Sequence, residues 1–297
     1  MGQPAECIGG ELLMADNGSA ILPDDYLVTS TDLKSVADSI RAKSGSTGQL
    51  EFPVGFKSAI DSIQSGGGAK EPYIEETYDS NGDLIDVNLV GYTNIRDHIF
   101  YNCTRLALTS LPSGITSIGD NAFYKCESLA LTSLPSGITS IGTYAFGNCK
   151  NLALTSLPSG ITSIGANAFH NCTSIALTNL PSGITSIENN TFFNCTRLAL
   201  TSLPSGITSI GTYAFYKCTS IALTNLPSGI TSIGNYAFQT CFGLISITFL
   251  GKPNSISSNA FNGCTNLKTI NVPWASGELS GAPWGAKNAT IKYNYTG

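Results

Sequence analysis

Apolar residues recur along most of this chain at one fixed interval. Phenylalanine stands at every 23rd position from Phe100 to Phe261, cysteine follows each of these residues by three positions, and isoleucine recurs from Ile95 to Ile256 at the same step. Eight units follow one another without insertion or deletion over about residues 95–273. Such a period indicates a solenoid, in which each coil buries the apolar edge of its neighbour.

Each unit contains three pieces with different local preferences. The stretch LALTSLPSGITSIG at residues 106–119 returns letter for letter at 129, 152 and 198. In it, LALTSL and ITSIG are short extended pieces, and PSG turns the chain between them. The rest of the unit, xxAFxxCxx, is expected to be a compact turn or a single helical turn that carries phenylalanine and cysteine inward. At the roughly 4.8 Å spacing of paired strands, eight coils would form a rod of about 35–40 Å.

The pattern IGxxAFxxCxxLxxxxLP resembles the leucine-rich repeats of the BspA type, found in bacterial surface proteins and in phage proteins. The last copies, LISITF and LKTINVP, follow the usual apolar spacing of that family, whereas the inner LALTSLP copies shift one apolar residue. The expected fold class is a repeat solenoid with β-rich coils of 23 residues, joined to a small N-terminal α-helical module and a β-hairpin cap.

The flanks do not share the repeat. Two amphipathic patterns, DLKSVADSIRAKSG and FPVGFKSAIDSIQ, predict a short αα-hairpin, and YIEETYDSNGDLIDVNLVGY predicts a β-hairpin whose tight turn uses Asn81-Gly82. Trp274 and Trp284 are expected to cover the last coil. The expected divisions are an N-terminal segment, possibly for attachment (1–30), the helical hairpin (31–65), a Gly-rich linker (66–71), the β-hairpin N-cap (72–94), the solenoid (95–273) and a C-terminal cap (274–297).

The flanks carry a second resemblance. The block DLKSVADSIRAKSGSTGQLEFPVGFKSAIDSI is similar to a module of tail-associated and baseplate-associated proteins in phages and prophages of gut Firmicutes. YDSNGDL and GAPWGAKNATIKYNYTG resemble parts seen with that module. This resemblance implies a virion-tail protein that recognises a host receptor.

Composition narrows the possible partners. Charged residues make up 12% of the chain, the formal net charge is −5, and no cluster of Lys or Arg is visible, so we expect no nucleic-acid partner. No apolar run approaches the roughly 20 residues that cross a bilayer, so membrane insertion is not expected. The N-terminus lacks a basic start followed by an apolar core, so no secretory signal is expected.

The nine cysteines could bind a metal, form disulfides or pack in the core as reduced thiols. Eight of them occur once per unit, with no CxxC pair, and the chain has two histidines. Side chains in register point the same way rather than at each other, which favours a column of small, reduced, buried thiols. Disulfides between coils and a metal site remain the alternatives, and Cys7 stands outside the register.

Two columns of positions vary most between the copies: the second residue before each phenylalanine and the residue directly after it. They are three residues apart, so on a helical turn they would face the same side. Tyr and Asn are frequent at these positions. Tyr offers a rigid ring with a hydroxyl, and Asn offers adaptable hydrogen bonds, so both suit a binding surface. Aromatic faces can also stack on sugar rings. Tolerated variation of exposed positions is the alternative interpretation. The candidate ligand-binding residues are Tyr101, Tyr124, Tyr144, His170, Phe193, Tyr213, Tyr216 and Tyr236.

Catalysis has little support. His98 and His170 are three coils apart, about 14 Å at the spacing of paired strands, and neither has a nucleophile in register with an orienting acid. We therefore expect a non-enzymatic protein without cofactor or metal. The leading hypothesis is a phage or prophage tail protein located in the virion. It would bind a bacterial surface glycan or protein and contact other tail proteins. We expect it to form a homo-oligomer. A BspA-like adhesin of the bacterial cell surface and a cytosolic interaction scaffold are the alternatives.

Overall fold

The computed structural model describes residues 13–14, 19–21, 27–29 and 72–296. The chain divides into two compact units, one containing Tyr73–Gly297 and the other Gly9–Pro72. In the second unit, strands β1 (Leu13–Met14), β2 (Ser19–Ile21) and β3 (Leu27–Thr29) pair antiparallel in that order. The expected helical hairpin (31–65) and linker (66–71) lie outside the described residues.

The first described elements of the larger unit are β4 (Tyr73–Tyr78) and β5 (Leu84–Val90), which pair antiparallel. Their connection is longer than the expected two-residue turn. The N–H of Gly82 donates to the carbonyl of Asp79 and the N–H of Asp79 to the carbonyl of Asp83, and of Asn81 and Gly82 only the glycine has a positive φ, at 80°. The extra residues open a wider loop, whose tip carries acidic groups.

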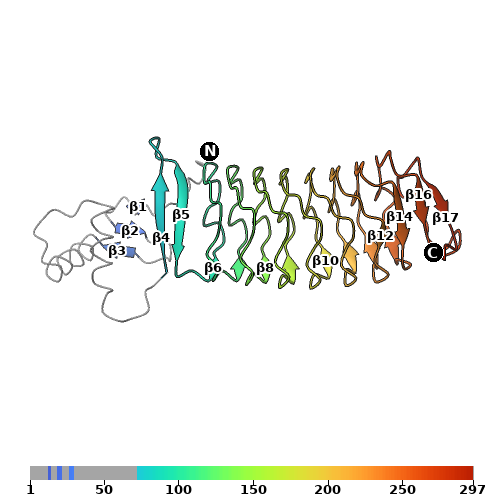
Figure 1. The fold of residues 1–297 in the computed structure, drawn as a ribbon, viewed down its shortest axis with the longest axis horizontal. Coiled ribbons are helices and arrows are strands. Elements are labelled where there is room, and N and C mark those ends of the chain that lie inside the picture. The colour runs from blue at the N-terminus through green and yellow to red at the C-terminus, as the bar shows by residue number, and fades with distance from the viewer. Residues whose placement is uncertain (1–12, 15–18, 22–26, 30–71, 297) are drawn as a thin grey trace, which may run out of the picture. The chain divides into compact units, whose positions relative to one another are not determined.

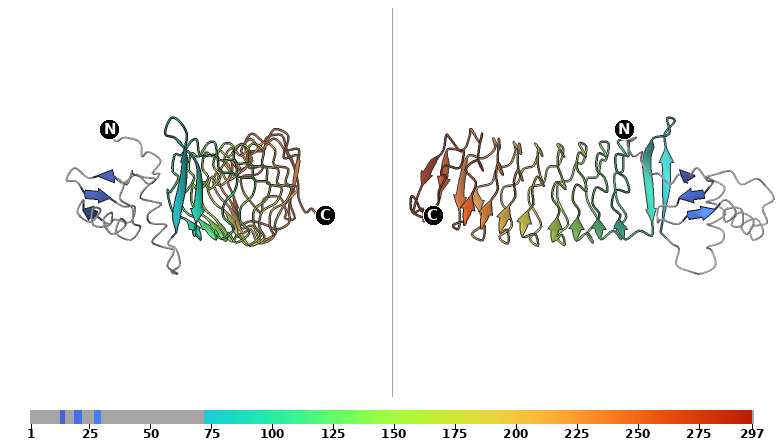
Figure 2. Two further views of the ribbon diagram at one scale, coloured as in Figure 1. Left: turned by 60° about the vertical axis from the view of Figure 1, so that its left-hand side comes forward. Right: turned by 180° about the vertical axis from the view of Figure 1, so that it is seen from behind.

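Behind the hairpin the chain winds into stacked coils, seen as a row from β6 to β17 in Figure 1. The Ser-Ile dipeptide of each ITSIG piece forms a two-residue parallel strand, in register with its copies. Figure 2 shows these strands aligned along one edge of the stack. They are β6 (Asn94–Ile95), β7 (Ser117–Ile118), β8 (Ser140–Ile141), β9 (Ser163–Ile164), β10 (Ser186–Ile187), β11 (Ser209–Ile210), β13 (Ser232–Ile233) and β15 (Ser255–Ile256).

The LALTSL pieces are not strands in most coils. Instead, one backbone hydrogen bond joins each copy to the previous coil, as from Ala130 N–H to the Leu108 carbonyl. Buried residues stand at the first, third and sixth positions of LALTSL but at the first, fourth and sixth of LISITF. A strand needs alternation at period two, which only the later copies provide. The strands on this side are β12 (Asn225–Leu226), β14 (Ser246–Phe249), β16 (Thr269–Asn271) and β17 (Thr290–Lys292).

The core consists of ladders of identical side chains, one rung per coil. The eight phenylalanines from Phe100 to Phe261 are buried and stack on one another, with ring centroids 5.1–5.7 Å apart. Beside them, the Sγ of each cysteine from Cys126 onward donates to the carbonyl of a phenylalanine one coil earlier, as from Cys172 to Phe146 at 3.0 Å. These ladders give the repeat its fixed length, because an insertion would displace both columns at once.

The ladder of Ser-Ile strands is interrupted once. Strands β6 to β9 form one sheet and β10, β11, β13 and β15 another. At the junction Glu188 stands where the neighbouring coils have Gly165 and Gly211. A Cβ at Gly165 would lie 2.6 Å from the backbone nitrogen of Thr143, so a side chain here requires the neighbouring backbone to shift. Ser257 is accommodated at this position while β15 pairs with β13. We therefore attribute the break in the sheet to the larger, charged side chain of Glu188.

Coil stacking continues past residue 273, where the sequence suggests only a cap. Strand β17 pairs in parallel with β16, and Ile291 takes its place beside Ile270. Trp274 and Trp284 are both buried, and each packs against Phe249 with ring centroids 5.4 and 6.0 Å away. The C-terminal segment therefore forms a further, irregular coil. A period of 23 does not reveal it, because the register of β17 is shortened by two residues.

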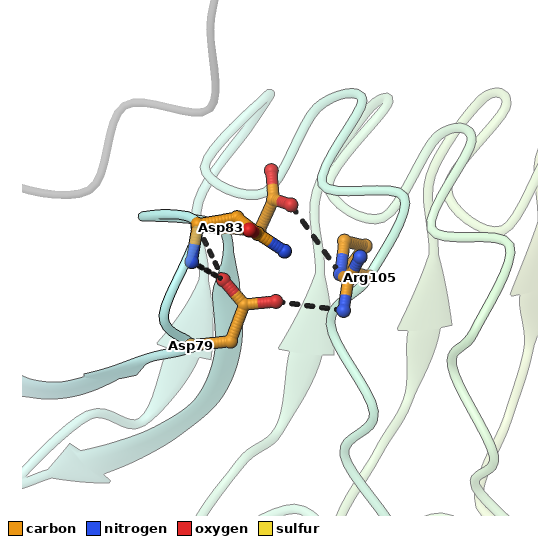
Figure 3. A network of polar contacts seen from close by, with 4 residues as sticks. Asp79, Asp83 and Arg105 are labelled. Atoms are coloured by element: carbon orange, nitrogen blue, oxygen red, sulfur yellow. Dashed lines mark hydrogen bonds and ion pairs between the residues drawn. The ribbon is translucent and has the colours of Figure 1, made fainter.

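A polar cluster joins the β4–β5 loop to the first repeat (Figure 3). One carboxylate oxygen of Asp79 accepts the N–H groups of Asn81 and Asp83 at 2.8 and 3.0 Å, and the other pairs with the Arg105 guanidinium at 2.6 Å. Asp83 also pairs with Arg105, at 3.4 Å. These bonds, led by the N–H of Asp83, hold the pKa of Asp79 below its ordinary value. The loop is thereby held on the first coil next to the variable columns.

Candidate binding surface

The variable columns lie on the turns around each phenylalanine. No helix forms there in residues 72–296, because two positions in each of the first seven repeats, and one in the eighth, adopt left-handed backbone angles. They are the second residue before phenylalanine and the second after it, as in Asn121 (φ 55°) and Lys125 (φ 60°). Of the two alternatives expected from the sequence, the compact turn forms and the single helical turn does not. The conformation explains the asparagines of these columns, since Asn tolerates positive φ better than other residues with a side chain.

The structure brings all eight candidate residues into one continuous strip of ring contacts. We call this set the aromatic strip, and each member is half-buried. It contains three stacked groups, joined by Tyr144 and by edge contacts of Tyr213 with Phe193 and Tyr216. The groups are Tyr101 on Tyr124 (5.2 Å between centroids), His170 on Phe193 on Tyr216 (4.6 and 4.4 Å), and Tyr213 on Tyr236 (5.2 Å).

Stacking decides which part of each ring meets solvent. Rings in neighbouring coils of a stacked group are within 20° of parallel, so their faces cover one another along the solenoid axis. The ring edges are the part of each stacked ring that its neighbours leave uncovered. This revises the expectation that aromatic faces stack on sugar rings, since most of those faces are already occupied. Within a stacked group, a ligand meets a row of edges, repeated at about the coil spacing of 4.8 Å.

The column after phenylalanine has one gap, at Gly147. A Cβ there would lie 2.8 Å from the ring of Tyr124 and 3.1 Å from the ring of Tyr144. Tyr144 closes the gap from the other column, meeting Tyr124 edge-on at 5.6 Å and the ring of His170 at 6.3 Å. Because Tyr144 fills the space left by Gly147, the strip stays continuous through seven consecutive coils, from Tyr101 to Tyr236.

His170 lies in the middle of the strip with its imidazole half-buried. Burial lowers the pKa of its imidazole below the ordinary value. Its Nδ1 is buried and has no hydrogen-bond partner among the described residues. The ring stacks on Phe193, which covers one face. The neutral imidazole therefore acts mainly as another flat apolar rung.

Three tyrosines of the strip occupy strained backbone positions. Tyr144, Tyr213 and Tyr236 each have φ of 54°, at the position where three other coils have Asn121, Asn167 and Asn190. A left-handed conformation costs a residue with a Cβ about 1 kcal/mol, and asparagine less. Drift under selection for stability alone would favour asparagine here. A strained residue retained on a surface is a reason to look for a function at that site.

Sequence reasoning missed three neighbours of the strip. His98 extends it at the first coil, with its ring 5.9 Å from that of Tyr101. The Nζ atoms of Lys125 and Lys217 lie 5.6 and 5.4 Å from the ring centroids of Tyr124 and Tyr216. The signal was present, because both lysines stand at a position that is Asn in four other coils.

The cysteines have no chemical role in this surface. Seven, from Cys126 to Cys264, are free and buried, as expected. Burial raises the pKa of each of these thiols, to about 12 for Cys264, so none is activated as a nucleophile. Cys103 differs from these seven because it is disulfide-bonded. It lies in the first repeat, so no phenylalanine carbonyl of a preceding repeat is there to accept a hydrogen bond from its sulfur. Cys7 lies outside the described residues.

No group of three or more His, Cys, Asp and Glu side chains among the described residues could hold a metal ion. Within the same residues, no helix has the length and apolar character needed to cross a bilayer.

Comparison with known proteins agrees with the coil geometry. The model of the BspA type leucine rich repeat region matches residues 75–199 and 194–280, in six copies, which is more than half of the chain. The chain belongs to the BspA type leucine rich repeat family. The stacked coils and the phenylalanine and cysteine ladders are thus the form that this repeat takes here.

Two solved structures are similar to this chain, and the first of them shares its fold. A leucine rich cell surface protein from Faecalibacterium prausnitzii is 23% identical, with a TM-score of 0.50, over 69% of this chain and 71% of that one. A leucine rich repeat protein of T. pallidum is 28% identical, with a TM-score of 0.47, over 66% of this chain and 88% of that one. No curated protein matches the chain.

Proposed function

We propose that this protein is a non-enzymatic recognition protein that acts at a bacterial surface and binds its target through the aromatic strip. The observation that carries the proposal is the retention of Tyr144, Tyr213 and Tyr236 at left-handed positions where asparagine would cost less. Tyrosine gives a large rigid contact with a polar tip, which suits recognition. The target would be a surface glycan or protein, and oligomers would add avidity.

The proposal includes a location at the bacterial cell surface. The structural neighbour from F. prausnitzii is named a leucine rich cell surface protein, and the BspA type repeat is the family of this chain. A role as a phage or prophage tail protein, with other tail proteins as partners, is the second candidate. It rests on the resemblance of a block within residues 31–65, which lie outside the described residues, and on the resemblance of YDSNGDL and GAPWGAKNATIKYNYTG. Proteomics of cell-envelope fractions and of purified virions would separate the two.

The experiment for the strip is binding of labelled protein to intact cells of a panel of gut Gram-positive bacteria. The variant carries Tyr144→Asn, Tyr213→Asn and Tyr236→Asn, which place a residue already used at this position in other coils. Since asparagine fits the backbone, the variant should fold, with a change in stability of about 1 kcal/mol or less per site. We expect binding to particular strains, lost in this variant.

A matched control carries Thr132→Ala, Thr155→Ala and Thr178→Ala, three exposed changes outside the aromatic strip. It should bind as the unchanged protein does. Selective binding that survives the tyrosine changes and fails in the threonine control would move the site away from the strip. Binding to no strain would contradict the proposed function.

A further inference from the structure

The side of the turns that follows phenylalanine has an unusual charge for an acidic protein. We call the second to fifth positions after phenylalanine the basic flank. In the eight repeats it holds five cations and one acid, while the whole chain has a net charge of −5. The third and fourth positions before phenylalanine show the reverse, with three acids and Arg96. The residues of the basic flank that carry charge are Arg105, Lys125, Glu127, Lys150, Arg197 and Lys217.

Some of these cations are already neutralised. Arg105 pairs with Asp79 and Asp83, and Lys150 pairs with Glu127 at 2.8 Å. Lys125, Arg197 and Lys217 are exposed and form no ion pair among the described residues. Three unpaired cations along one side of a solenoid create a positive track that attracts anions.

The two lysines are held at a cost in backbone energy. Lys125 and Lys217 have φ of 60° and 57°, at the position of Asn148, Asn171 and Asn194 in the coils between them. Those asparagines form a ladder, with Nδ2 donating to the preceding Oδ1 at 2.9 and 3.0 Å. Asparagine would suit the backbone better and could lengthen this ladder, so its absence at residues 125 and 217 indicates a use for the charge.

The chemistry of the track fits an elongated ligand. Lys125 and Lys217 are four coils apart, about 19 Å along the axis at the strand spacing. Between them lie the amides of the ladder and the uncovered edges of the aromatic strip, both of which offer hydrogen bonds rather than open ring faces. Such a row suits hydroxyl groups repeated along a chain, with acidic groups held at the two lysines.

We infer that the basic flank and the adjoining aromatic strip bind an extended anionic polysaccharide or polyol phosphate, lying along the solenoid axis. The inference rests on the proposed function, of which it names the ligand class. Acidic groups of the polymer pair with Lys125, Lys217 and Arg197, and its hydroxyls exchange hydrogen bonds with the asparagine amides and tyrosine hydroxyls.

The test is binding of the full chain to three immobilised polymers: polygalacturonate, poly(glycerol phosphate) and neutral dextran. The variant is Lys125→Asn with Lys217→Asn, and the matched control is Lys268→Asn with Lys292→Asn, an equal loss of charge elsewhere on the surface. We expect binding to at least one anionic polymer, weakened by salt, with no binding to dextran. The flank variant should bind about five- to tenfold more weakly, and the control as the unchanged protein does.

The two anionic polymers distinguish carboxylate from phosphate as the recognised group. A flank variant that binds as well as the control, or equal binding to dextran, would overturn the inference. An unchanged melting temperature of the flank variant shows that a loss of binding is not a loss of fold. Strain-selective cell binding through the tyrosines, without binding to either anionic polymer, would leave the proposed function standing and overturn only the ligand class.

Discussion

Phe192 and Phe193 are neighbours in the chain, and each belongs to a column of rings that repeats every 23 residues. The column of Phe192 is phenylalanine in all eight repeats, whereas that of Phe193 includes Tyr, Gly, His, Gln and Asn. Phe192 is fully buried and Phe193 half-buried. A site closed on every side admits one shape, because a change of volume leaves a cavity or a clash. A site open to solvent on one side accepts side chains of several sizes, so function rather than packing can determine the residue there.

The largest expected effect separates these two neighbours directly. Phe192→Ala removes a ring stacked between Phe169 and Phe215 and should lower the free energy of unfolding by about 3–5 kcal/mol. Phe193→Ala should cost about 1–2 kcal/mol, because no closed cavity forms. Urea denaturation of both variants gives the difference. Equal losses would show that the two columns are not distinct in packing.

The next effect concerns the backbone contact between coils. A Cβ at Gly142 would lie 2.6 Å from the carbonyl carbon of Gly119, so Gly142→Glu should cost about 1–3 kcal/mol and open the sheet there. The reciprocal change, Glu188→Gly, should leave stability within about 0.5 kcal/mol or raise it.

Hydrogen exchange at Thr185 is the sharper measurement for Glu188→Gly. The amides of Thr162 and Thr208 donate to the previous coil, to Thr139 and Thr185 respectively. Restored pairing would slow exchange of the Thr185 amide. Unchanged exchange would assign the interruption of the sheet to another residue of that coil.

A smaller effect is expected from the cysteine ladder, which shares the closed interior with phenylalanine. Cys172→Ala removes a buried sulfur that donates to Phe146 and should cost about 1–2 kcal/mol. In the native protein at pH 8, the seven free thiols should not react with a maleimide, because burial raises their pKa. They should all react in denaturant. Rapid labelling of native Cys172 would contradict a closed interior.

The smallest effect belongs to the exposed cluster of Figure 3. The pKa of Asp79 is lowered in the folded protein, so its contribution to stability is present above the ordinary pKa of a carboxyl and is lost as pH falls through the lowered value. Asp79→Asn should therefore reduce the melting temperature slightly at neutral pH. The two proteins should converge at acid pH, and a constant difference across the range would contradict this origin.

Much of the fold could be predicted from the chain itself, since identical residues at a fixed step must stack on one another. Phe100 to Phe261 and Cys126 to Cys264 were placed in the interior on that ground, and they are buried. The candidate residues were also recognisable, as variation within an otherwise uniform repeat. The pattern did not decide between a compact turn and a helical turn, because that choice depends on φ at single positions, such as Tyr144 and Lys125.

The sequence by itself determined the period, the composition of each interior column and the family, because these follow from spacing and apolar character alone. Only the tertiary structure decided that the strip shows ring edges, that Tyr144 closes the gap at Gly147, and that the sheet stops at Glu188. Each of these depends on how atoms of neighbouring coils meet. A repeat records which residues are neighbours, but their orientation is set by packing and by backbone angles that the pattern of apolar residues does not carry.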